Sequence, residues 1–174
     1  MIVGQVIGAL VTVLCLFTPH FKRKWQMAAS AIVANLLSAL NFLLLGQVSA
    51  CAIGVVSVVQ AIFSIRHARN DTLPTKAEIW SFGILYIYGG LLPYLVSGTL
   101  SEFRFLDMLP MLAALLFLAY LSQKDEQRMR LFLLGNASIY LIYNAIIFST
   151  QFFAQLFTVI SVVVAIIRYR KKTN

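Results

Sequence analysis

The sequence is poor in charged residues, above all in acidic ones. Of its 174 residues only 11% are charged, and Asp and Glu together number six. All six acids lie between the apolar runs or at their ends, so no carboxylate pair falls within a run. Proton- and sodium-driven carriers generally need an ionisable or strongly coordinating group at depth in the membrane. The shortage of acids therefore favours passive passage over coupled transport.

Cysteine and histidine are scarce as well. The two cysteines, Cys15 and Cys51, lie inside apolar runs, where a role as small buried hydrophobic residues is favoured over a disulfide. The two histidines, His20 and His67, lie at the ends of runs, where we expect them to face solvent or lipid headgroups. No nucleophile–base pair and no cluster of metal ligands falls within a run. We therefore expect no enzyme, no metal and no cofactor.

Hydrophobic residues make up 60% of the chain, and the mean hydropathy is +0.86. Soluble domains have about 45–50% apolar residues. Short charged clusters separate apolar runs of about 20 residues, the length that crosses a hydrocarbon core of about 30 Å as a helix. The sequence therefore predicts an all-α, polytopic protein whose main partner is the lipid bilayer. The net charge of +8 does not indicate nucleic-acid binding, because the basic residues flank the runs and form no separate patch.

The chain is organised around two apolar runs joined only by Gly46-Gln47, and a similar hairpin returns about a hundred residues later. Thr75 and Glu78 fit a capping box at the start of another helix, which Gly89-Gly90 and Pro93 are expected to bend. Seven spans are predicted in all: Ile2–Thr18, Trp25–Leu45, Val48–Ile65, Thr75–Val96, Asp107–Leu121, Met129–Phe148 and Thr150–Ile167. In the fifth span, Asp107 is expected to be the N-cap, with Pro110 in the first turn.

Basic residues are distributed very unevenly between the two sides that seven spans define. Thirteen of the fourteen Lys and Arg residues fall on one side, which the positive-inside rule predicts to be cytoplasmic. This assignment puts the N-terminus outside and the C-terminus inside. The other side has only Arg104. We expect the uncharged stretch from Met1 to Phe17 to be a retained first helix, since a signal peptide carries its positive charge before the apolar run. The thirteen are Lys22, Arg23, Lys24, Arg66, Arg69, Lys76, Lys124, Arg128, Arg130, Arg168, Arg170, Lys171 and Lys172.

The order of spans and basic turns repeats along the chain. Residues 1–66 are predicted to form a first three-helix bundle, residues 67–105 a connection with a linker helix, and residues 106–174 a second three-helix bundle with a basic tail. A spacing of 103 matches Asn41 with Asn144, and one of 102 matches Arg66 with Arg168. Because the fourth span restores the direction of the chain, this 3+1+3 plan implies parallel repeats about an axis along the membrane normal.

Polar side chains form stripes on several predicted spans. On the sixth, four polar residues fall at i, i+4, i+7 and i+8 and share one helical face. Gln151, Gln155 and Thr158 share a face of the seventh span, and Ser30, Asn35, Ser38 and Asn41 lie near one face of the second. The alternative is hydrogen bonding between helices, worth about 0.6 kcal/mol on average in membranes. The candidate solute-binding residues are Asn41, Gln60, Asn136, Tyr140, Tyr143, Asn144 and Gln155.

Three short motifs along the chain are Asn41-Phe42-Leu43-Leu44-Leu45-Gly46, Met108-Leu109-Pro110 and Ile167-Arg168-Tyr169. They resemble the YgjV-like family of bacterial inner-membrane proteins, which implies a multi-pass protein of the cytoplasmic (inner) membrane. The 3+1+3 topology also resembles the SWEET and PQ-loop superfamily, which includes sugar facilitators. The Pro-Gln pair of that group is absent, since His20 follows Pro19 and Met111 follows Pro110. A proline-hinged rocking mechanism therefore does not carry over.

Two functions are compatible with these features. In the first, the polar stripes bind a small uncharged polar solute, or let it pass, at the interface between the two bundles. In the second, the protein moves nothing and acts as a structural or receptor-like membrane protein. Its basic face, Lys22–Lys24 and Arg168–Lys172, would then hold anionic lipid or a partner. The small-residue ridge of Gly4, Gly8 and Thr12 on the first span permits a homodimer but is equally explained by close helix packing.

Overall fold

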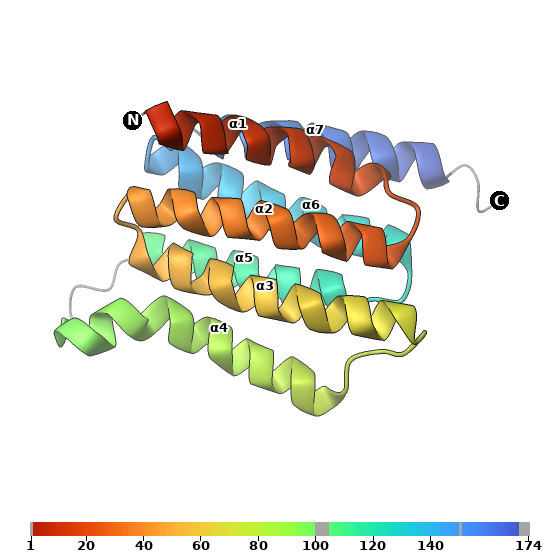
Figure 1. The fold of residues 1–174 in the computed structure, drawn as a ribbon, viewed down its shortest axis with the longest axis horizontal. Helices are drawn as coiled ribbons and strands as arrows, with labels where there is room; N and C mark the ends of the chain where they lie inside the picture. Colours follow the sequence, from red (N-terminus) through yellow and green to blue (C-terminus); the bar gives the residue numbers. More distant parts are fainter. Residues whose placement is uncertain (1, 100–104, 150, 171–174) are drawn as a thin grey trace.

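A computed structural model describes residues 2–99, 105–149 and 151–170. Within these ranges the chain forms α-helices and one 3-10 turn and no strand, which confirms the all-α prediction. Successive helices run back and forth along one axis, so that α1 begins at one end of the bundle and α7 ends at the other (Figure 1). The elements are α1 (Ile2–Phe17), η1 (Thr18–His20), α2 (Lys24–Leu44), α3 (Val48–Arg69), α4 (Lys76–Ser97), α5 (Phe105–Ser122), α6 (Glu126–Ile146) and α7 (Gln151–Arg170).

Six of the described helices, α2 to α7, are long and apolar enough to cross a membrane. The first, α1, has 16 residues and continues into η1. Large apolar side chains point outward from the bundle, for example Trp80, which is 73% exposed, and Ile160, which is 52% exposed. Such an exterior fits hydrocarbon better than water. The prediction of a multi-pass protein in contact with the bilayer is therefore confirmed, while the direction in which the chain crosses stays a prediction from its basic residues.

Some residues behind the topology prediction lie outside the described part of the chain. They are Arg104, the basic residue expected on the opposite side, and Lys171 and Lys172 of the basic tail. Thr150 of the second tight turn is another. We call the end of the bundle that carries Lys22–Lys24 the basic end, and the end that carries Gly46 the turn end.

Six helices form a closed ring. The main contacts join α1 to α2, α2 to α3, α3 to α5, α5 to α6, α6 to α7, and α7 back to α1. The fourth helix stands outside this ring against α3 and α5, as Figure 1 shows. Exchanging α1, α2 and α3 with α5, α6 and α7 leaves the neighbour pattern unchanged. A two-fold axis through the ring would have this effect.

The fourth helix begins where the sequence places it. The Thr75 side chain accepts a hydrogen bond from the Glu78 backbone N–H at 3.2 Å, and the Thr75 backbone N–H donates to the Glu78 carboxylate at 2.6 Å. Together these bonds form the predicted capping box. The helix continues through Pro93 and changes direction along its length (Figure 1). A Cβ on Gly90 would lie 2.3 Å from Met111 Cγ, so the glycine allows α4 and α5 to approach closely.

Several helices extend beyond their predicted bounds, and α3 and α6 show the reasons. α3 continues one turn past Ile65 to Arg69, because His67 and Arg69 are compatible with a helix end at the membrane surface. α6 begins at Glu126 and is capped by Asp125, whose carboxylate accepts from the Gln127 N–H at 3.1 Å. Glu, Gln and Arg are good helix formers, so the polar residues before the apolar run join the helix.

The predicted start of the fifth helix is wrong. α5 begins at Phe105, so Asp107 lies in its first turn and is not the residue that caps it. Phe105 and Leu106 are apolar and extend the helix beyond the polar residue that the prediction used as its boundary. Pro110 is consequently the sixth residue of the helix and lies within it, beyond the first turn.

The turn between α2 and α3 reverses the chain at a glycine. Gly46 has φ +72°, and the Gln47 N–H donates to the Phe42 carbonyl at 2.8 Å. A bond across five residues with a left-handed residue before the donor is the Schellman arrangement that commonly ends helices. Glycine is favoured at this position because it adopts positive φ without a steric penalty.

The turn between α6 and α7 has the same geometry without a glycine. Phe148 has φ +52°, and the Ser149 N–H donates to the Asn144 carbonyl at 2.9 Å. Comparing the two turns matches Asn144 with Phe42, at a spacing of 102. The match of Asn144 with Asn41 proposed from the sequence is therefore one residue out of register with the turn geometry.

Candidate binding site

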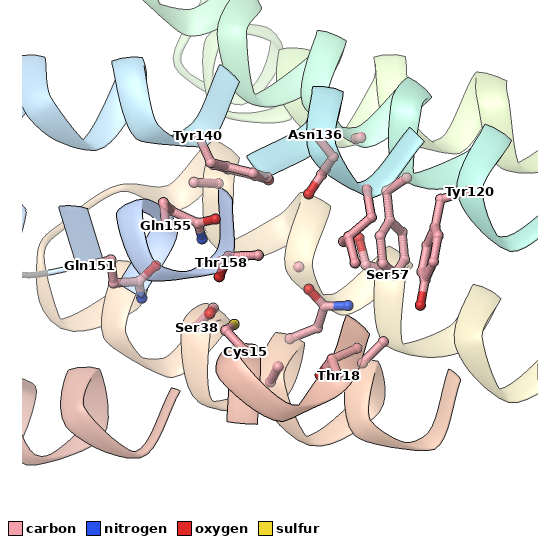
Figure 2. A pocket seen from close by; sticks show the side chains of 18 of the residues that line it. Cys15, Thr18, Ser38, Ser57, Tyr120, Asn136, Tyr140, Gln151, Gln155 and Thr158 are labelled. Carbon is pink, nitrogen blue, oxygen red and sulfur yellow. The ribbon is translucent and has the colours of Figure 1, made fainter. Parts of the chain in front are cut away.

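A cavity of about 80 Å³ lies inside the ring of helices. Its lining comes from α1, η1, α2, α3, α5, α6 and α7, and α4 contributes no residue to it. Figure 2 shows polar side chains converging on this space from several helices. We call it the central cavity. Its polar lining residues are Cys15, Thr18, Asn35, Ser38, Ser57, Tyr120, Asn136, Tyr140, Gln151, Gln155 and Thr158.

None of the residues that line the central cavity is charged. Four carboxamides and several hydroxyl groups supply both donors and acceptors. The Asn136 side-chain amide donates to the Ala113 carbonyl at 2.7 Å, and Figure 2 shows its oxygen directed toward the cavity. A lining of this kind is suited to an uncharged polar solute, since it offers a buried ion no compensating charge.

Three buried polar atoms of the lining have no hydrogen-bond partner. They are Asn35 Nδ2, the Tyr120 hydroxyl and Gln151 Nε2. Tyr120 is 0% exposed and Gln151 is 1% exposed, so neither reaches water at the surface of the bundle. An unpaired buried donor costs about 1–3 kcal/mol, and such groups are rare in native structures. All three atoms are able to donate, so acceptor oxygens of water or of a solute in the cavity would be suitable partners for them.

The size of the central cavity limits what it holds in this conformation. A dry engineered cavity of about 150 Å³ accommodates benzene, with its six carbon atoms. At about 80 Å³, the central cavity accommodates a few waters or a solute of roughly three or four non-hydrogen atoms. A larger solute would require the helices to separate.

The lining residues recur at a nearly constant spacing along the chain. Eight pairs account for sixteen of the nineteen, with the first member in α1, η1, α2 or α3 and the second in α5, α6 or α7. Pairs 102 residues apart are Cys15 with Phe117, Thr18 with Tyr120, Ala31 with Leu133, Ala34 with Asn136 and Ser38 with Tyr140. Pairs 101 residues apart are Ala50 with Gln151, Gly54 with Gln155 and Ser57 with Thr158.

Aromatic rings close the central cavity toward the turn end. Phe42 of α2 packs against Tyr140 and Tyr143 of α6, with ring centroids 6.4 and 6.2 Å apart. The Tyr143 hydroxyl donates to Gln47 Oε1 at 3.2 Å, which joins α6 to the turn after α2. Since Phe42 and Tyr140 also line the cavity, this aromatic group separates it from the turn end.

On the side of the basic end, the charged side chain of Arg130 holds the segment that covers the cavity. Arg130 of α6 is only 3% exposed, and its guanidinium donates to the carbonyls of Pro19 and Phe21 at 3.0 and 3.3 Å. Its carbon lies 4.5 Å above the ring of Tyr169, whose hydroxyl donates to the His20 carbonyl at 3.2 Å. The sequence places Arg130 only among the basic residues at the cytoplasmic ends of the spans. It is buried because the segment from Thr18 to Phe21 folds over it.

His20 is also held within this closure. Its Nε2 lies 3.1 Å from the Ser161 hydroxyl, which donates to the Leu16 carbonyl at 2.7 Å. Burial, reinforced by the positive charges of Arg168 and Arg130, lowers the pKa of His20 below the ordinary value of 6.5. The expectation that solvent or headgroups surround this ring is therefore wrong, since α7 covers one of its nitrogens.

A second, smaller cavity of about 10 Å³ lies between α3, α4 and α5 near the basic end. A space of this size holds about one water. Gln60, Ser64, His67 and Glu78 are among its lining residues. The imidazole of His67 lies 3.1 Å from the Glu78 carboxylate, so this cavity, unlike the central one, borders an ionisable pair.

The structure divides the residues predicted to bind a solute. Asn136, Tyr140 and Gln155 line the central cavity, whereas Gln60 lines the second one. The remaining three are buried toward the turn end and line neither space. Their part in binding stays a prediction. They are Asn41, whose Nδ2 is unpaired; Tyr143, bonded to Gln47; and Asn144, whose Nδ2 donates to the Tyr140 carbonyl at 2.7 Å while its Oδ1 is unpaired.

Sequence reasoning placed Asn35, Ser38, Gln151 and Thr158 on polar stripes but did not select them, and it missed Tyr120. Gln151 lies in the first turn of α7, next to the predicted tight turn, and was the least central member of its stripe. The neighbours of Tyr120, Leu118 and Leu121, are apolar, so no stripe marks it. In the described part of the chain no three His, Cys, Asp or Glu side chains come together as metal ligands.

An open cleft of about 440 Å³ lies on the surface of the basic end. Four cationic side chains border it, and Asp71 and Glu126 partly balance them. Lys124 lies 3.5 Å from Asp71, but both side chains are exposed, so this ion pair contributes little. The four cationic residues are Lys22, Arg23, Lys24 and Lys124.

A bundle of membrane-length helices with an apolar exterior, around a cavity with an uncharged polar lining, defines a polytopic membrane protein. The model of the bacterial inner membrane protein family Imp-YgjV matches residues 2–173. The chain therefore belongs to this family and is a multi-pass protein of the bacterial inner membrane, as its resemblance to YgjV-like proteins predicted. No curated protein and no solved structure matches it.

Proposed function

We propose that the central cavity binds a small uncharged polar solute and that the protein lets this solute cross the inner membrane without coupling to an ion. The observation that carries the proposal is the unpaired Tyr120 hydroxyl and Gln151 amide beside an uncharged cavity between the two halves of the ring. Proteins tolerate such costs mainly where function requires them. The proposal includes no catalytic step.

The solute class follows from the lining. Donors without partners favour an acceptor oxygen on the solute, and the absence of charge from the lining disfavours ions. The volume favours the smallest members of the class, such as urea, a short amide or a short polyol. Tyr140 provides an aromatic face, so the panel also includes a small uncharged heteroaromatic ring, which would enter only if the helices separate.

The test measures binding and passage separately. Purified protein is melted with and without each solute of the panel, and the same solutes are followed into protein-containing and empty liposomes. A solute that raises the melting temperature and crosses only with protein supports the proposal. If no solute does either, the proposed function is wrong.

A matched pair of variants links any activity to the cavity. Gln151→Met removes a buried unpaired donor, so the fold should be as stable as before or more stable, whereas binding should weaken at least fivefold. Gln123→Met is the control, since Gln123 lies outside the cavity and bonds only within α5. Ala34→Leu, which fills the cavity opposite Asn136, should abolish binding without unfolding the protein.

A second candidate function rests on the cleft at the basic end. Its four cationic side chains would hold an anionic lipid headgroup or an acidic partner, and the central cavity would then be a structural space filled by water. Replacing Lys22, Arg23 and Lys24 by Gln separates the two functions. If the variant binds anionic-lipid vesicles more weakly, the cleft has a role in lipid binding. If its solute flux is unchanged, the cavity serves solute passage independently of the cleft.

A further inference from the structure

The central cavity is closed in two places toward the basic end, and these closures are built differently. One lies at Thr18, where η1 covers the cavity. The other lies at Ser57 of α3, beyond which the second cavity begins. These two closures are the candidate routes for a solute between the cavity and the basic end.

Hydrogen bonds from a charged side chain hold η1 in place at the closure near Thr18. The two guanidinium hydrogen bonds from Arg130 to the carbonyls of Pro19 and Phe21 join η1 to α6. Tyr169 and Ser161 add bonds from α7, at 3.2 Å to the His20 carbonyl and 2.7 Å to the Leu16 carbonyl. Charge-assisted hydrogen bonds are roughly twice as strong as neutral ones. Opening this closure would also leave a buried guanidinium without partners.

The polar contacts at the closure near Ser57 are made by neutral groups, among them the Tyr86 hydroxyl. The Tyr86 hydroxyl of α4 lies within hydrogen-bond distance of Gln60 Oε1 and is 3.2 Å from Ser57 Oγ. Ser57 lines the central cavity and Gln60 lines the second, so this hydroxyl bridges the two spaces. Tyr86 is 0% exposed, so its hydroxyl makes these contacts inside the bundle, away from the surface.

Beyond Tyr86, the bonds that hold α3 against α5 are long. Gln60 Nε2 donates to the Leu118 carbonyl at 3.4 Å, and the Ser64 hydroxyl donates to the Leu121 carbonyl at 3.3 Å. Both distances exceed the usual range of about 2.7–3.2 Å, so these bonds are weak. Ser57, Gln60, Ser64 and His67 follow at i, i+3, i+7 and i+10, which places them along one face of α3. This polar face runs from the central cavity to the hydrogen-bonded pair of His67 and Glu78.

We propose that Tyr86 is the gate of the central cavity toward the basic end and that the solute passes between α3, α4 and α5 along this polar face. The proposal rests on the proposed function, since it describes the route of the same solute. It gives α4 a role beyond linking the two bundles. Displacing the Tyr86 side chain joins the two cavities, whereas η1 stays in place.

The test compares the two closures with one reporter. In a chain with Cys15→Ala and Cys51→Ala, the variant Ser38→Cys places a single thiol in the central cavity. A small uncharged thiol reagent, methyl methanethiosulfonate, is added to the protein in detergent, and the rate of labelling is compared between the variants. Tyr86→Phe removes only the bridging hydroxyl, and Arg130→Lys keeps the charge but loses the two-carbonyl geometry. Melting temperature and size-exclusion profile verify that each variant is folded.

We expect Tyr86→Phe to raise the labelling rate about fivefold, the factor for one neutral hydrogen bond, and Arg130→Lys to change it less than twofold. A rise in the labelling rate only with Arg130→Lys would place the route at η1 and overturn the proposal. No rise with either variant would also overturn it. Solute-induced shifts in melting temperature are measured on the same chain. If a solute binds but the labelling rate rises only with Arg130→Lys, the gate is refuted and the proposed function is not. If labelling rises with Tyr86→Phe as expected but no solute binds, the proposed function is refuted and the gate is not.

Discussion

Arg130 is the residue whose loss should cost the fold most, because its guanidinium donates to two backbone carbonyls inside the bundle. In Arg130→Leu, the Pro19 and Phe21 carbonyls lose charged donors at 3.0 and 3.3 Å. A hydrogen bond to a charged group contributes about 1.5–3 kcal/mol, and stacking on Tyr169 adds about 0.5–2 kcal/mol. Part of this loss is offset, because the variant no longer has the free-energy cost of desolvating a buried charge. We expect a net loss of about 3 kcal/mol, or roughly 6–12 °C in melting temperature for a chain of this size.

The assay is thermal unfolding in detergent, followed by the loss of monodisperse protein. Arg128, two residues earlier in α6, is exposed and provides the matched control, so Arg128→Leu should change the melting temperature by less than about 2 °C. Arg130→Lys should lie between Arg130→Leu and the unmodified chain, because an ammonium group neither bridges both carbonyls nor stacks as well. Equal effects of Arg130→Leu and Arg128→Leu would refute the assignment of Arg130 as the fastening of η1.

Three further perturbations test separate parts of the fold. Gly90→Ala places a Cβ 2.3 Å from Met111 Cγ and should cost about 1–3 kcal/mol, and adding Met111→Ala should recover most of the lost melting temperature. Phe148→Gly should raise the melting temperature by relieving a φ of +52°, a gain of up to about 1 kcal/mol, whereas Gly46→Ala, at φ +72°, should lower it by a similar amount. The pKa of His20 is lowered by burial and by two neighbouring guanidinium groups, so the unfolded chain binds the proton more readily. Stability is therefore complete above the unfolded value of 6.5 and falls as the pH drops below it. The melting temperature should decline from pH 7.5 to 5.5 in the unmodified chain and less steeply in His20→Gln; parallel profiles would contradict this account.

The helices could be predicted from the sequence because the length of an apolar run is a local property. α2 begins one residue from its predicted start, and the Thr75 capping box is present as expected. The errors occur where polar residues adjoin a run, as at Glu126, because composition does not show whether such residues continue a helix. Arg130 illustrates the limit best. Its partners lie 109 to 111 residues earlier in the chain, and no local pattern indicates that they cover it.

The candidate site was only partly predictable, for a related reason. Stripes on a helix show which polar residues share a face, and this led to Asn136, Tyr140 and Gln155. Whether a face meets a cavity or a neighbouring helix depends on how six helices close into a ring. Tyr120 has apolar neighbours, so its sequence context resembles core packing, yet its hydroxyl is one of the unpaired groups beside the cavity.

The pairing of lining residues at spacings of 101 and 102 explains why the cavity is both open and polar. The members in the first half are mostly small, such as Ala34, Ala50 and Gly54, and their counterparts in the second half are long amides: Asn136, Gln151 and Gln155. A two-fold arrangement brings equivalent positions to opposite walls of one space. Where both walls had large side chains the space would be filled, and where both had small ones it would offer no polar contacts. The first half therefore provides room, and the second half provides the larger polar side chains of the lining. It follows that enlarging Ala34 should block binding sterically, whereas shortening Gln151 or Gln155 should leave the space open and remove the contacts.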